Sequence, residues 1–388
     1  MERAGLERLV RAPGCARDRA GCVFLEDPNA GVASGGEPAA LPSAIAHRPS
    51  AIPKGWLCLA TGGTGGARKW ARHDERTLAA AVAGVRAHFG LGRINAVDVL
   101  PPYHVSGLMA RVRAAATGGE HFFWDWKRLE GGELPRLPAR DDGWVISLVP
   151  TQVHRLLARP VAVEWLRSLR LIFVGGGPVW PALADAMAGA ELPAAISYGL
   201  TETAAMVTAL RPEEFLAGER SSGTALPHAR VRVDAEGVVC VAGESVFWGY
   251  WPGFSEQREL ATGDLGEIDS RGHLRVLGRR DAVIITGGKK VHPEEVEAAL
   301  RAGGEDEAVT VVGVPDPEWG EMVVACFPRT SDAATHGKER AEALAPHQRP
   351  KRFLAIEPWP VLPNGKINRL ELRAAAAARL GAMGRDAS

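Results

Sequence analysis

The sequence predicts an α/β protein whose large N-terminal domain has mostly parallel sheets covered by helices plus a small β-subdomain. A small C-terminal α+β domain follows, joined by a hinge. Apolar strands alternate with helical stretches from Trp56 onward, and shorter alternating strands follow after about residue 220. The last hundred or so residues read as a separate unit, and 388 residues are enough to bury more than one core. We place the two domains at residues 1–280 and 281–388.

The bulk composition fits a soluble protein and narrows the classes of function. The 46 basic residues balance 46 acidic ones, which gives no electrostatic reason to expect nucleic acid or an anionic membrane as a partner. The charged N-terminus lacks the apolar core of a signal peptide, and no apolar run reaches the roughly 20 residues that span a bilayer. The cysteines are odd in number and scattered, so we expect a cytoplasmic protein, and no zinc site is suggested: Cys15, Cys22, Cys58, Cys240, Cys326.

The first half of the chain alternates strands and helices. Residues 1–55 are rich in Ala, Gly and Pro and read as a thin lead-in with one helix (Glu2 to Val10) and one strand (Cys22 to Leu25). Residues 56–60 form an apolar strand that enters a Gly-rich loop, and the next helix begins near Asp74 and ends at Gly90. Four further apolar segments predict parallel strands: 95–100, 143–149, 169–174, 194–197. Ligands of such sheets lie beyond the carboxyl ends of the strands, where the unusual loops fall.

The C-terminal unit begins near Arg280. Residues 281–285 lead to a Gly-Gly turn, and Pro293 opens a helix that ends at a glycine. The strand at 309–314 and a basic C-terminal stretch complete an α+β unit.

Two loops have the composition of a phosphate site. Residues 61–69, TGGTGGARK, follow a strand, and their backbone N–H groups, hydroxyls and Lys69 could surround a phosphate; a flexible turn is the alternative. Residues 198–203, YGLTET, place a carboxylate between two threonines, which suits a largely hydrated Mg²⁺. The alternative is a capping sequence in which Thr201 or Glu202 only starts a helix.

Two later loops complete the set. In ATGDLGEID (261–269), Asp264 could accept hydrogen bonds from two ribose hydroxyls, or the Gly-Asp pair could be a plain turn. In LPNGKINR (362–369), the Asn-Gly turn would hold Lys366 at a loop tip, where an ordinary surface lysine is the alternative.

In this order and spacing, the segments from about Leu57 to Arg369 resemble the ANL superfamily of acyl-CoA synthetases, adenylation domains and luciferases. The resemblance implies ATP, Mg²⁺ and coenzyme A as co-substrates, with no tightly bound prosthetic group. Thr201, Glu202 and Lys366 would be catalytic, Thr201 touching the α-phosphate and Glu202 holding Mg²⁺. Asp281 would be the hinge, and Gly287, Gly288 and Lys289 would line the CoA channel. The implied ATP-binding residues are Thr61, Gly62, Gly63, Thr64, Gly65, Gly66, Lys69, Gly175, Gly176, Gly177, Tyr198, Gly199, Asp264, Arg279.

Three segments around the expected acid pocket, 101–108, 147–157 and 173–178, resemble the o-succinylbenzoate–CoA ligases of menaquinone biosynthesis. Their substrate is an aromatic ketodiacid, so the pocket must hold a second carboxylate. His104, Ser106, Arg113 and Thr151 are the implied acid-binding residues. Arg113 falls where relatives carry a basic residue; Arg111 is a rival, and both could instead face solvent. For His104 the alternative is a core histidine bonded to a backbone carbonyl.

The expected function is therefore an AMP-forming acid–CoA ligase acting on o-succinylbenzoate. The alternatives are a ligase for another aryl or short-chain acid, a thiol acceptor other than CoA, and a degenerate nucleotide-binding paralogue. The phosphate loop has Gly62 and Gly65 where the family carries hydroxyls, which predicts weaker ATP binding. This loop also lies earlier than in full-length relatives, so we expect much of the first N-terminal subdomain to be absent and a homodimer partner to be a candidate cover.

Overall fold

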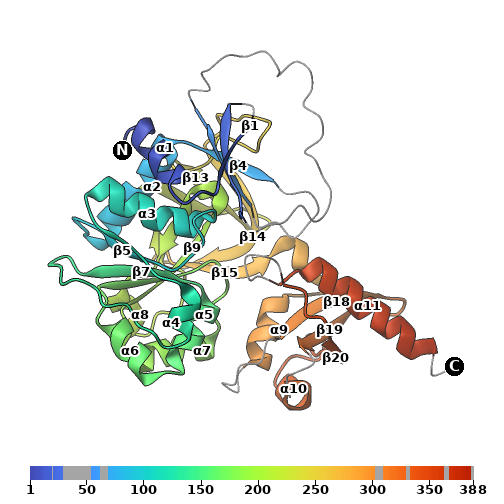
Figure 1. Cartoon of the computed structure of the whole chain (residues 1–388). Coiled ribbons are helices and arrows are strands. Elements are labelled where there is room, and N and C mark those ends of the chain that lie inside the picture. Colours follow the sequence, from blue (N-terminus) through green and yellow to red (C-terminus); the bar gives the residue numbers. More distant parts are fainter. Residues whose placement is uncertain are drawn as a thin grey trace.

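The structure is a computed structural model that describes residues 1–19, 21–28, 54–61, 69–301, 309–328, 333–361 and 367–385. It confirms the predicted fold class: mixed α/β sheets with helices, followed by a separate α+β group. Figure 1 shows the C-terminal elements, orange to red, gathered beside the rest of the chain.

The N-terminal segment is more than a lead-in, because it completes a four-stranded sheet. Strand β2 pairs parallel with β3, which pairs antiparallel with β4, and Leu6 and Val10 of the first helix are buried in the same core. The prediction of a thin lead-in was therefore wrong for the described residues before 29. The elements are α1 (Arg3–Arg11), β1 (Ala16–Arg19), β2 (Cys22–Leu25), β3 (Leu57–Ala60), β4 (Trp70–His73) and α2 (Glu75–Phe89).

The local signals around α2 act as the sequence predicts. The Asp74 carboxylate accepts hydrogen bonds from the N–H groups of Arg76 and Thr77, which satisfies the first turn of the helix. Gly90 ends the helix in the left-handed conformation.

The central sheet has seven strands in the order β11-β10-β9-β8-β7-β5-β6. The five strands from β9 to β6 are parallel, as predicted, whereas β10 and β11 add an antiparallel edge. The strands are β5 (Asn95–Asp98), β6 (His121–Phe123), β7 (Trp144–Leu148), β8 (Leu171–Val174), β9 (Ala194–Leu200), β10 (Ala205–Ala209) and β11 (Thr224–Ala225).

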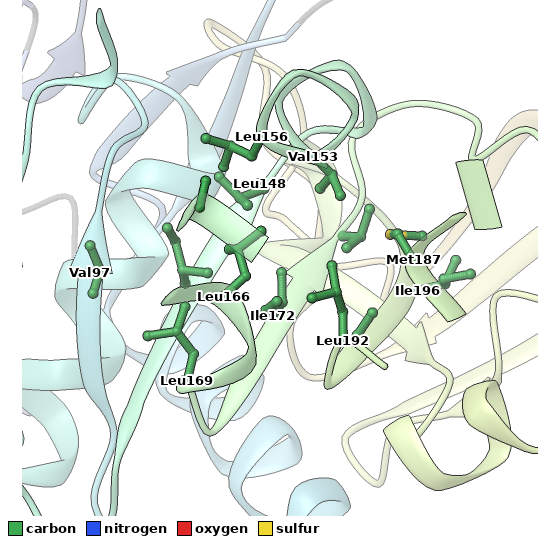
Figure 2. Packing of buried hydrophobic residues seen from close by; sticks show 14 of the residues in the cluster. Val97, Leu148, Val153, Leu156, Leu166, Leu169, Ile172, Met187, Leu192 and Ile196 are labelled. Carbon is green, nitrogen blue, oxygen red and sulfur yellow. The ribbon is translucent and has the colours of Figure 1, made fainter. Parts of the chain in front are cut away.

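Helices cover the central sheet and bury its apolar residues. Figure 2 shows Leu148, Ile172 and Ile196 of the sheet packed with residues from the helices that follow β7 and β8. Because these strands are buried along most of their length, they hold the backbone at their carboxyl ends, and the side chains there, in fixed positions. The helices are α3 (Val105–Thr117), α4 (Trp126–Glu130), α5 (Pro150–Leu157), α6 (Pro160–Arg167), α7 (Pro181–Gly189) and α8 (Pro212–Leu216).

The β-subdomain predicted after residue 220 is a four-stranded antiparallel sheet. Its strands are β12 (Ala229–Val233), β13 (Val238–Gly243), β14 (Glu259–Ile268) and β15 (Leu274–Arg279).

The C-terminal group is a five-stranded sheet covered by helices. No helix among the described residues is long and apolar enough to cross a bilayer. The elements are β16 (Ile284–Thr286), β17 (Lys289–Val291), α9 (Pro293–Leu300), β18 (Thr310–Asp316), β19 (Gly320–Pro328), α10 (Ala333–Ala341), β20 (Arg352–Ile356) and α11 (Arg369–Arg385).

Candidate active site

The base of the phosphate loop is formed by two paired strands. Thr61 N–H donates to the Lys69 carbonyl at 3.0 Å, so the residues that flank the predicted phosphate loop are joined at the ends of β3 and β4. Gly62, Gly63, Thr64, Gly65 and Gly66 lie outside the described residues, as does Lys366. The exposed Lys69 lies with its Nζ 5.2 Å from the ring centre of Tyr250.

Tyr250 connects that loop to the predicted magnesium carboxylate. Its hydroxyl donates to Glu202 Oε1 at 2.7 Å, and its backbone forms a bridge with Ala71 of β4. Burial, followed by the Glu202 charge, raises the pKa of Tyr250, so the phenol stays a donor. Glu202 is half-buried, and among the described residues only the Tyr250 hydroxyl donates to its carboxylate, which leaves room for a hydrated cation. Sequence reasoning missed Tyr250; the only signal was its place in the aromatic run 247–254.

The turn at residues 201–203 is followed by strained backbone and is hydrogen-bonded to a buried histidine. Thr201–Thr203 form one turn of 3-10 helix, so part of the capping alternative also holds. Ala204 and Ala205 then adopt φ of 53° and 82°, a region that alanine rarely occupies. His73 Nε2 donates to the Thr201 carbonyl at 2.7 Å, and burial lowers the pKa of His73 to about 4. The neutral imidazole thus positions the turn, a role that no sequence pattern indicated.

The predicted nucleotide residues of three different strands come together. Tyr198 of β9 donates from its hydroxyl to Asp264 Oδ2 at 2.7 Å, and Arg279 Nη1 donates to Asp264 Oδ1 at 3.2 Å. Asp264 is 7% exposed, and burial raises the pKa of Tyr198. Each Asp264 oxygen already accepts one protein donor and keeps a second lone pair for a ligand hydroxyl.

The glycines of the expected adenine slot lie at the carboxyl ends of β8 and β9. Gly175 to Gly177 follow β8 directly, and the Gly175 N–H donates to the Leu148 carbonyl at 3.2 Å. At Gly199 a Cβ would lie 2.0 Å from the Ala205 carbonyl oxygen, so only glycine lets β9 and β10 approach there.

The two candidate arginines of the acid pocket differ completely in their partners. Arg111 Nε donates to the buried Asp98 Oδ2 at 2.8 Å, which also lies 2.9 Å from His121 Nε2. Arg113 is 2% exposed, its guanidinium carbon lies 5.1 Å from the Phe173 ring centre, and its Nε has no hydrogen-bond partner among the described residues. Burial alone lowers the pKa of Arg113 to about 10, so it remains a cation at neutral pH.

The remaining acid-pocket candidates surround the start of α3 and α5. His104 is the N-cap residue of α3 and contacts the Tyr103 ring at 4.8 Å between ring centres. Ser106 is half-buried. It lies seven residues, about two helical turns, before Arg113, so the two share a face of α3. Thr151, in the first turn of α5, is exposed.

The expected hinge follows β15 of the β-subdomain, and the expected CoA loop is a turn within the C-terminal sheet. Asp281 pairs with Arg279 at 3.1 Å, next to the Asp264 contact of the same arginine. Gly287 and Gly288 form the turn between β16 and β17 with φ of 55° and 75°, which glycine adopts without strain. A Cβ at Gly287 would lie 3.0 Å from the Trp319 ring. Lys289 begins β17 and is exposed.

The fold is that of an α/β protein whose candidate site residues gather near the carboxyl ends of parallel strands, where ligands of such sheets usually bind. The model of the family described as "AMP-binding enzyme" matches residues 56–251, half of the chain, and the chain belongs to this family. This agrees with the resemblance found in the motifs.

Named relatives and solved structures add detail. The 2-succinylbenzoate–CoA ligase of Listeria monocytogenes is 30% identical over 293 residues, covering 71% of this chain and 60% of that protein. The o-succinylbenzoate CoA synthetase of Bacillus subtilis in complex with its acyl-adenylate superposes with a TM-score of 0.71, 26% identity, 82% of this chain and 69% of that chain. The same enzyme in complex with ATP and magnesium superposes with a TM-score of 0.68 at 25% identity. The match covers 82% of this chain and 70% of that chain. The chain therefore spans about 60% of the length of the first relative.

Proposed function

We propose that this protein is an AMP-forming ligase that converts o-succinylbenzoate, ATP and CoA into o-succinylbenzoyl-CoA, AMP and diphosphate. Relatives carrying that activity in their names support the reaction. The observation that carries the choice of acid is Arg113, a buried cation without a described carboxylate partner. Such a cation is costly unless a ligand supplies the anion, and the distal carboxylate of a diacid does so.

In the first half-reaction, a carboxylate oxygen of the acid attacks the α-phosphorus, and the bond to the diphosphate oxygen breaks. Attack of one anion on another needs alignment and positive charge more than acid–base chemistry. Lys69 and Lys366 would supply charge from the chain, while Thr201 orients the α-phosphate. Mg²⁺, held through Glu202, would neutralise phosphate oxygens; the hydrogen bond from Tyr250 keeps that carboxylate in place.

The nucleotide would be held between the carboxyl ends of β8 and β9 and the middle of β14. We assign the adenine slot to Gly175–Gly177, Tyr198 and Gly199, and the ribose hydroxyls to Asp264 with Arg279. The buried Tyr198–Asp264 contact supports this assignment, because it fixes the carboxylate before ligand binding.

In the second half-reaction, the CoA thiol sulfur attacks the acyl carbonyl, the bond to AMP breaks, and the thiol proton leaves to solvent. We propose that residues 281–388 rotate about Asp281 relative to residues 1–280 between the two steps. Lys366 would then withdraw, and the Gly287-Gly288-Lys289 turn would admit the narrow pantetheine arm. The homodimer and the cytoplasmic location expected from the sequence stay predictions.

The direct test is diphosphate release with ATP, Mg²⁺ and CoA on o-succinylbenzoate, benzoate, acetate and octanoate. Selectivity for o-succinylbenzoate with formation of its CoA thioester supports the proposal. Turnover of another acid keeps the ligase and removes the assigned substrate, whereas no turnover by a folded protein favours the degenerate paralogue.

A variant of Lys366 separates the two half-reactions. Lys366→Ala should abolish adenylate formation, because the charge at the α-phosphate is lost, yet leave thioester formation from supplied acyl-adenylate largely intact. Both steps are measured on the same preparation. Equal loss of both would refute the assigned role.

A further inference from the structure

A second cluster of ionisable groups lies between α8 and the turn that joins β14 to β15. Glu219, Asp269 and His273 each direct one ligand atom into the cluster, and these three atoms lie within 4.8 Å of one another. His273 Nδ1 is 3.4 Å from Asp269 Oδ2 and 3.5 Å from Glu219 Oε2. None of these residues belongs to the nucleotide or acid site.

His273 is the observation that points to a ligand. It is 6% exposed, and within the described part of the chain its Nδ1 has no hydrogen-bond partner although two carboxylate oxygens face it. A buried imidazole nitrogen without a hydrogen bond costs free energy. A bound ion that contacts this nitrogen and both carboxylate oxygens would remove that cost. The alternative is a protonated imidazole that forms an ion-pair cluster with the carboxylates.

The carboxylates are already oriented by the backbone. Glu219 Oε1 accepts the N–H groups of Arg220 and Ser221, and Asp269 Oδ1 accepts those of Arg271 and His273. One oxygen of each group is thus fixed, which leaves Oε2 and Oδ2 to face His273. On the other side of the ring, His273 Nε2 lies 3.5 Å from Glu214 Oε1. A carboxylate behind a metal-bound histidine is a common arrangement that orients the ring.

We propose that Glu219, Asp269 and His273 bind a divalent first-row transition ion, with Zn²⁺ as the best fit. Ligand atoms about 2.1 Å from a tetrahedral ion lie roughly 3.4 Å apart, which matches both separations from His273 Nδ1. The imidazole favours Zn²⁺ over Mg²⁺ or Ca²⁺, and water would complete the coordination. The scattered cysteines gave no hint of this site because it contains no sulfur ligand.

Arg271 is the competitor for the same oxygens. Its guanidinium contacts Glu219 Oε2, and its Nε lies 3.4 Å from Asp269 Oδ2, yet its side chain is 65% exposed. Such an exposed side chain can move into solvent at little cost when an ion enters. The ion would join the segment after α8 to the β14–β15 turn, and so fix the β-subdomain against the central sheet.

The test is Zn²⁺ binding by calorimetry on the full chain after chelator treatment, in excess Mg²⁺ and without nucleotide. Wild type should take up one Zn²⁺ that His273→Gln loses, with affinity reduced at least about 100-fold. Glu214→Gln should reduce affinity by about tenfold. Co²⁺ in place of Zn²⁺ should give the visible absorption of a tetrahedral site.

Two further variants keep the test independent of folding defects in His273→Gln. Arg271→Gln removes the competing cation from an exposed position, so it should raise Zn²⁺ affinity severalfold. His347→Gln, a histidine outside the cluster, should leave binding unchanged. No uptake by wild type, equal uptake by His273→Gln, or unchanged affinity in Arg271→Gln would each overturn the proposal.

Discussion

The arginines on the two sides of helix α3 have opposite surroundings: Arg111 faces a carboxylate, whereas Arg113 faces an aromatic ring. Arg111 closes a network with Asp98 and His121, in which the Asp98 side chain is fully buried and accepts from both neighbours. Arg113, two residues further along, lies over Phe173 without a described carboxylate partner. Residues two apart project from opposite sides of a helix, so neither arginine can replace the other.

The difference separates an arginine that has a carboxylate partner from one whose proposed partner is the substrate. In the Arg111 network the charges compensate one another, and nothing further is needed. At Arg113 the desolvation cost is not offset by the described residues, a pattern typical of functional sites, where local stability is given up. The comparison therefore selects Arg113 over Arg111 as the proposed carboxylate-binding residue.

The largest effect is expected when the charge of Arg113 is removed. Arg113→Gln should lower kcat/KM for o-succinylbenzoate by roughly 100- to 1000-fold, the usual result of truncating one partner of a buried charge pair. The value for benzoate should change by only a few fold, because benzoate has no second carboxylate. Steady-state kinetics with both acids measure the ratio.

The matched control lies on the same helix. Arg111→Lys keeps a cation near Asp98 and should leave the ratio between the two acids unchanged. An equal loss for both acids in Arg113→Gln would remove Arg113 from the pocket.

A smaller effect, on stability rather than turnover, is expected at Arg111. Arg111→Met should lower the free energy of unfolding by roughly 2–3 kcal/mol, because the buried Asp98 loses its arginine and, among the described residues, keeps hydrogen bonds only with His121 and the Leu100 N–H. Urea unfolding followed by tryptophan fluorescence measures this loss. Adding Asp98→Asn should recover part of it, since the uncompensated charge is gone; an additive loss would contradict the network.

Much of the fold could be predicted because its signals are local. Asp74 caps α2 and Gly90 ends it, and the buried strands of the central sheet appear as apolar runs between turns. Tyr198, Asp264 and Arg279 could be assigned together only because their motifs resemble those of the superfamily. The structure brings Asp264 and Arg279 together through the pairing of β14 with β15, and Tyr198 reaches Asp264 from β9 of the central sheet.

The missed residues depend on contacts between distant segments. Tyr250 is brought to Glu202 by its antiparallel backbone bridge with Ala71, and no local sequence pattern predicts that bridge. His73 similarly reaches Thr201 across the fold. The choice between Arg111 and Arg113 needed the position of Asp98, whose side chain a sequence cannot orient. The N-terminal segment was underestimated because its composition obscured the apolar positions Leu6 and Val10.

The smallest expected effect has the opposite sign and makes the comparison sharpest. Arg113→Met should raise the free energy of unfolding by about 1 kcal/mol without ligand, because a flexible apolar side chain replaces an uncompensated buried cation against Phe173. The same urea titration that shows a loss for Arg111→Met should show this gain. The same Arg→Met substitution would then change the free energy of unfolding in opposite directions at two positions two residues apart, which packing alone does not explain. A loss at Arg113 comparable to that at Arg111 would mean that its guanidinium stabilises the fold, and would argue against a position held for the substrate.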